Sequence, residues 1–260
     1  MGGKNRYSML KQVSVLMALD MIGFVGELIA TFASAILDGA SHQEVSNALN
    51  VYATWTIWTL RLIVWLLTLA ALSRLSELHL SFGKARIWYL LRIPAFLMAN
   101  LTVVVFYYRY PDPLSNPHYA FALFGALIFI AVLTFLGDIL ALSAGSRAIL
   151  FADATLLDSF GLETCATQSR RCGNALLGFA AVQTIPFAAA VALAFRLLLA
   201  ADAALSAGEV LETETWKALV VLDAGLISLC LLIGVGTFVF RILALIRANQ
   251  AYRAFRKLTQ

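Results

Sequence analysis

The chain has 260 residues, of which 61% are hydrophobic and only 13% are charged, and its mean hydropathy is +0.84. Soluble domains carry about 25% charged residues, so this chain has too few polar side chains to cover a soluble core. These values predict an integral membrane protein. The net charge of +4 comes from basic residues that form no single patch, which argues against nucleic-acid binding.

Six apolar runs are each long enough to cross a bilayer, which takes about 20 residues in a helix. They cover residues 12–37, 49–73, 87–108, 119–143, 174–200 and 217–246. We therefore expect an all-α fold, a polytopic bundle of six transmembrane helices that forms a single transmembrane domain over residues 1–260. The first run is too long and too acidic for a signal peptide, so we interpret it as a retained span.

Basic residues gather on one side of this topology. The side that holds both termini and the second and fourth loops carries Lys4, Arg6, Lys11, Arg74, Lys84, Arg86, Arg147, Arg170, Arg171, Arg247, Arg253, Arg256 and Lys257. The other side carries Arg109 and Lys217, together with Asp38, Glu44, Asp112, Asp202, Glu209, Glu212 and Glu214. The positive-inside rule therefore predicts that both termini are cytoplasmic. The expected location is the plasma (cell inner) membrane.

Charged residues inside the predicted spans are balanced in sign. They are Asp20, Glu27, Asp138, Asp223, Arg61, Arg92, Arg196 and Arg241. An uncompensated ion in the membrane costs several kcal/mol, so each of these residues is expected to find a partner. Counting depth from the span ends predicts four pairs: Arg92 with Asp138, Arg241 with Asp20, Arg61 with Glu27, and Arg196 with Asp223.

These pairs have two interpretations. In the first, they are interhelical ion pairs that fix the order of the helices. In the second, Asp20, Glu27 and Arg61 line a polar pathway or a proton relay, because Glu27 and Arg61 fall near mid-membrane, where a side chain reaches water least easily. Asp20 and Glu27 are seven residues apart, close to two helical turns, so they share one helix face.

The longest connection, residues 144–173, is predicted to be cytoplasmic. Its apolar positions suit an amphipathic helix on the inner membrane surface: Ile149, Leu150, Leu156, Leu157 and Phe160. An ABC permease would use such a helix to dock its ATPase, and six spans with both ends inside fit that scheme, although the loop has no EAA-type motif. A membrane-complex or ATPase partner at 144–173 and an interfacial helix without a partner both stay open, beside the lipid bilayer itself.

Catalytic chemistry is disfavoured by the residue types within the spans. Three histidines are present, His42, His79 and His118, and all lie in predicted loops. Neither a haem held between spans nor a catalytic histidine pair is therefore expected. Three cysteines are present, Cys165, Cys172 and Cys230, without metal-ligand spacing, and we expect free thiols. We predict no enzyme activity, no cofactor and no metal.

Two classes of function remain. The first is a small-solute or ion transporter, or a permease subunit, whose route is lined by the carboxylate–arginine pairs. The second is a non-catalytic scaffold or accessory subunit of a larger membrane complex, in which the same pairs only hold the bundle together. A water-filled cavity that reaches Glu27 would favour transport, and a fully packed bundle would favour the scaffold. We expect transport, because charged residues lie near mid-membrane.

Overall fold

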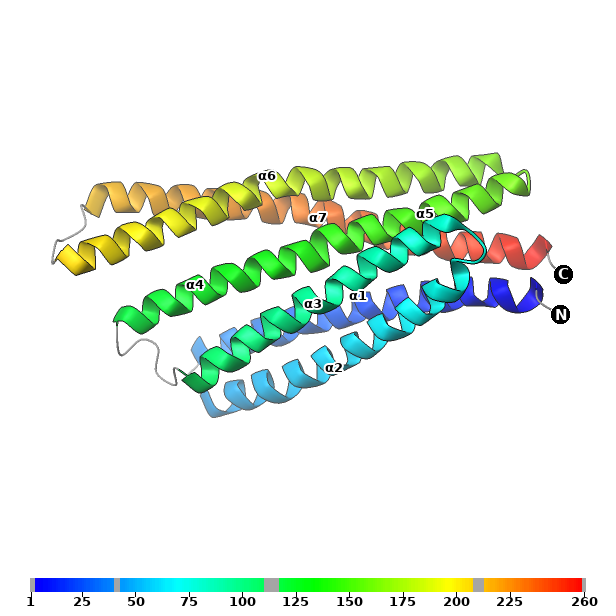
Figure 1. The fold of residues 1–260 in the computed structure, drawn as a ribbon. Coiled ribbons are helices and arrows are strands. Elements are labelled where there is room, and N and C mark those ends of the chain that lie inside the picture. Colours follow the sequence, from blue (N-terminus) through cyan, green and yellow to red (C-terminus); the bar gives the residue numbers. More distant parts are fainter. Residues whose placement is uncertain (1–2, 40–42, 110–116, 208–212, 259–260) are drawn as a thin grey trace. The chain divides into compact units, whose positions relative to one another are not determined.

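The computed structural model describes residues 3–39, 43–109, 117–207 and 213–258, and within these ranges it is helical, without a strand. Figure 1 shows the elements: α1 (Gly3–Gly39), α2 (Gln43–Leu75), α3 (Leu80–Arg109), α4 (Pro117–Thr134), η1 (Phe135–Ala141), α5 (Leu142–Ser159), α6 (Glu163–Ala207) and α7 (Thr213–Leu258). In the described ranges, six helical stretches are long and apolar enough to cross a membrane, which confirms the expected all-α fold and is consistent with a multi-pass membrane protein. His42, Asp112, Glu209 and Glu212 lie outside these ranges.

Several helices extend well beyond the predicted spans. α6 has 45 residues and α7 has 46, which makes each of them roughly 70 Å long at 1.5 Å per residue. A hydrocarbon core of about 30 Å accounts for less than half of that length. Hydropathy identifies only the apolar part of such a helix, and for this reason the predicted loops 144–173 and 201–216 are largely helical in the structure.

α4, η1 and α5 follow one another without a break (Figure 1). The chain then turns at Gly161, whose φ of 74° suits glycine, and continues into α6. The predicted interfacial helix is thus the end of a long helix. Its residues Ile149, Leu150 and Leu157 are at most 1% exposed. These three side chains pack against protein, and the position of the helix at the membrane surface stays a prediction.

Contacts divide the chain into two units. Unit 1 comprises Met1–Tyr89, Ala148–Ser169 and Leu245–Gln260, and unit 2 comprises Leu90–Arg147 and Arg170–Ala244. Unit 1 holds most of the large, fully buried side chains: Val13, Trp65, Leu72, Leu75, Phe82, Tyr89, Ile149, Leu150, Leu157 and Phe255.

Polar and aromatic contacts hold α6 to α7 within unit 2. Gln183 Nε2 donates to the Cys230 carbonyl at 3.2 Å, and Thr237 Oγ1 donates to Gln183 Oε1 at 3.1 Å. The rings of Phe179 and Phe240 stack, with their centroids 5.1 Å apart. Buried amide groups need such partners, because an unmet hydrogen bond inside a protein costs about 1–3 kcal/mol.

Candidate functional site

A charged cluster joins α1 to α2 within unit 1. We call it the α1–α2 cluster, and it comprises Asp20, Gly23, Glu27, Trp58, Arg61 and Trp65. On each helix its three members are spaced i, i+3 and i+7, which places them on one face. The two helices run antiparallel, side by side, so the two faces meet along their length (Figure 1).

Each carboxylate of the cluster contacts an indole and the same guanidinium. Trp65 Nε1 donates to Asp20 Oδ1 at 2.6 Å, and Trp58 Nε1 donates to Glu27 Oε1 at 3.1 Å. Arg61 Nη1 donates to Glu27 Oε2, as depth counting predicted, while Arg61 Nε lies 3.7 Å from Asp20 Oδ1. The Arg61 and Asp20 side chains are 3% and 6% exposed, and that of Glu27 is 31% exposed. The cluster is therefore buried at Asp20 and partly exposed at Glu27.

The Arg61 side chain is held by its surroundings as well as by the two acids. Its Cζ lies 5.0 Å from the centroid of the Trp65 ring, a cation–π distance. A Cβ atom at Gly23 would lie only 2.8 Å from Arg61 Cγ. Because glycine has no Cβ atom, the aliphatic part of the Arg61 side chain can pass close to α1 at this position. The guanidinium then reaches both carboxylates.

A second charged cluster is centred on η1, a π-helix, in unit 2. Arg92 of α3 donates from Nη2 to Asp138 Oδ1 at 2.7 Å, which forms another of the predicted pairs. Arg241 of α7 donates from Nη2 to the main-chain carbonyl of Asp138. Asp138 thus accepts hydrogen bonds from two arginines, from one on its side-chain carboxylate and from the other on its main-chain carbonyl. The predicted contact of Arg241 with Asp20 would join the two units, and it stays a prediction.

A cavity of about 540 Å³ lies between α4, η1, α6 and α7 in unit 2. Its walls are mostly apolar and include Phe135 and Phe187, whose stacked rings have centroids 4.0 Å apart. Asp223 also lines it, and its Oδ1 is buried without a hydrogen bond from the described part of the chain. Arg196 is exposed and, among the described residues, does not come within ion-pair distance of Asp223. That predicted pair is wrong.

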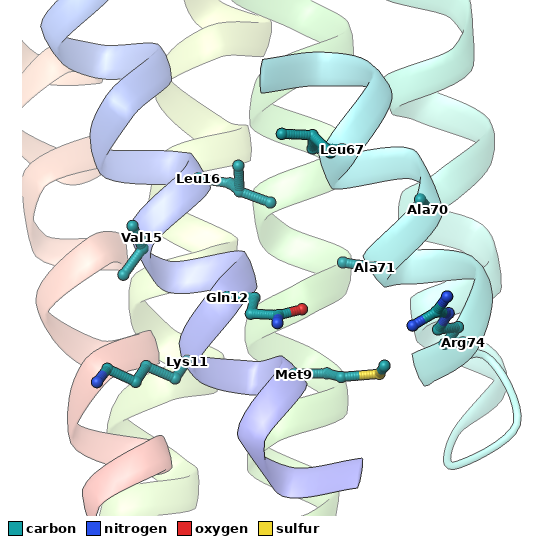
Figure 2. A pocket seen from close by; sticks show the side chains of 9 residues that line it. All are labelled: Met9, Lys11, Gln12, Val15, Leu16, Leu67, Ala70, Ala71 and Arg74. Carbon is teal, nitrogen blue, oxygen red and sulfur yellow. The ribbon is translucent and has the colours of Figure 1, made fainter. Parts of the chain in front are cut away.

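Glu27 and Arg61 line neither this cavity nor a second one of about 580 Å³ between α1 and α2 (Figure 2). Neither cavity is therefore the one reaching Glu27 that would favour a transport route through the α1–α2 cluster. The volume of the unit 2 cavity falls within the range of about 300–1,000 Å³ that is typical of small-molecule sites.

Sequence reasoning missed the indole donors and the polar contact of Gln183. A signal for the former was present, since Trp58 and Trp65 share a helix face with Arg61. In the described residues, no group of three or more His, Cys, Asp or Glu side chains is placed to hold a metal ion.

No family model, curated protein or solved structure matches this chain.

Proposed function

We propose that this chain is a membrane transporter, or a permease subunit, for a small cationic solute or ion, and that Asp223 is its charged contact point. The observation that carries the proposal is the cavity between α4, η1, α6 and α7, where Asp223 Oδ1 accepts no hydrogen bond from the described residues. A carboxylate within a membrane-spanning bundle is stabilised by a positive partner. The apolar walls and the stacked Phe135 and Phe187 rings favour a solute with some apolar surface.

Uptake by proteoliposomes tests this proposal. Liposomes that contain the wild-type chain should take up sodium or tetramethylammonium ions faster than empty liposomes. Asp223→Asn should lower the rate by about ten-fold or more, because the amide keeps the shape of the side chain but provides no counter-charge. Its melting temperature should match the wild type. Glu163→Gln, which removes an exposed carboxylate at the start of α6, is the matched control and should transport normally. Wild-type rates no higher than those of empty liposomes for both ions would reject the proposal.

The α1–α2 cluster favours a second candidate function, that of a non-catalytic scaffold or accessory subunit of a larger membrane complex. Both of its carboxylates contact indoles and Arg61, an arrangement suited to fixing α1 on α2. A route through Asp20, Glu27 and Arg61 would have to break these contacts in each cycle. We therefore assign the cluster a structural role in the transporter as well.

We further propose that both termini lie in the cytoplasm, with the chain in the plasma (cell inner) membrane. The basic residues of the tails and of two loops support this orientation. Energy for transport would come from an ion gradient or from an ATPase partner. The exposed turn after α5, where Phe160 is 39% exposed, is the part of 144–173 that we propose for contact with such a partner.

Cysteine labelling tests the orientation. Cys165 is exposed, whereas Cys172 and Cys230 are buried, so Cys165 is the natural reporter for the predicted inner side. A membrane-impermeant maleimide should label Cys165 in inverted vesicles and leave it unlabelled in intact cells. In a Cys165→Ser background, Leu205→Cys should give the opposite pattern. Labelling of Cys165 from outside intact cells would overturn the proposed orientation.

A further inference from the structure

The cavity between α1 and α2 is a groove near the first turns of α1 and the last turns of α2, within unit 1. Figure 2 shows Met9, Gln12 and Leu16 projecting from α1 toward α2, and Leu67 projecting back toward α1. On the α2 side, Ala70 and Ala71 are among the lining residues. Because their side chains are small, they leave the room that makes the groove.

Two cations border this groove and no acid lines it. Lys11 of α1 and Arg74 of α2 are both lining residues and both exposed, and Figure 2 shows the Lys11 side chain projecting to the outer side of α1, away from α2. Neither lies within ion-pair distance of an acidic side chain in the part of the chain that the structure describes. The groove thus combines an apolar floor with a positive border.

We propose that this groove binds an anionic phospholipid of the membrane leaflet that faces it. One acyl chain lies along Leu16 and Leu67, and the negative headgroup lies near Gln12, in the field of Lys11 and Arg74. Basic pockets between transmembrane helices attract anionic headgroups, and each buried methylene group adds to the affinity. A zwitterionic lipid would fill the same apolar floor, but its headgroup carries no net charge for the two cations. The site should therefore prefer anionic lipid, and this inference stands apart from the transport function.

Lipid-dependent melting of the delipidated, purified protein in detergent tests the site. Phosphatidylglycerol should raise the melting temperature at a concentration about thirty-fold lower than phosphatidylcholine does, the ratio expected for two basic residues near a membrane surface. Lys11→Gln with Arg74→Gln should reduce that ratio to near one. The matched control is Lys84→Gln with Arg86→Gln, which removes two exposed cations outside the groove, and it should keep the preference.

Two further measurements separate the contributions of the headgroup and of the acyl chain. Glycerol 3-phosphate carries the headgroup charge without an acyl chain, and it should leave the melting temperature unchanged. Ala70→Phe fills the groove from an exposed position and should weaken the effect of both lipids. Equal potency of the two lipids on the wild type, an anionic preference that survives in the double variant, or a full response to glycerol 3-phosphate would each overturn the proposal.

Discussion

Replacing Arg61 with glutamine should destabilise the folded protein by about 3–5 kcal/mol, the usual cost of removing one partner from a buried ion pair. Arg61 contacts both Glu27 and Asp20, and its side chain is only 3% exposed. The variant would keep two negative charges on one face of α1 without the cation that lies between them. The indole donors would still contact the carboxylates, but they supply no compensating charge.

Unfolding of purified variants in detergent, followed by circular dichroism, measures this loss. Arg196→Gln is the matched control, because Arg196 also lies within a predicted span but is exposed, without an ion pair to a described residue. Its loss should stay below about 1 kcal/mol. Gly23→Ala should reproduce part of the Arg61 effect, since a Cβ atom there would displace the arginine stem. Equal losses for the two arginine variants would contradict the role assigned to the α1–α2 cluster.

Asp138→Asn should destabilise the protein by about 1–3 kcal/mol, because it leaves the buried guanidinium of Arg92 without its carboxylate. Removing the charge of Arg92 as well, in Asp138→Asn with Arg92→Gln, should recover part of the loss. The contact from Arg241 should persist in both variants, since it uses the main-chain carbonyl. A double-mutant cycle gives the coupling energy, and strictly additive losses would show that the two side chains are not partners.

Depth counting predicted two contacts correctly and one wrongly, for a physical reason. The distance of a residue from the end of its span fixes its height in the membrane, and Arg61 matches Glu27 in height as Arg92 matches Asp138. Height does not fix the direction in which a helix face points. Arg196 matches Asp223 in height, but it lies on an exposed part of α6 and makes no pair with it.

Other features lay beyond sequence patterns altogether. The apolar residues Ile149, Leu150 and Leu157 predicted an amphipathic helix, and the helix exists, but the pattern does not state whether lipid or protein covers the apolar face. The π-helix η1 has no hydropathy signature, because its seven residues are apolar except for Asp138 and so look the same in either helical register. The unit 2 cavity depends on how α4, α6 and α7 pack, which no single run of residues encodes.

The assignment of the solute site to Asp223, with a structural role for the α1–α2 cluster, is tested most directly by one paired measurement. Uptake per folded molecule and melting temperature are determined together for Asp223→Asn and Glu27→Gln. We expect Asp223→Asn to melt like the wild type and to lose uptake. We expect Glu27→Gln to melt at a lower temperature and to keep the wild-type uptake per folded molecule. Loss of uptake in Glu27→Gln at an unchanged melting temperature, together with normal uptake in Asp223→Asn, would contradict the assignment and place the route in the α1–α2 cluster.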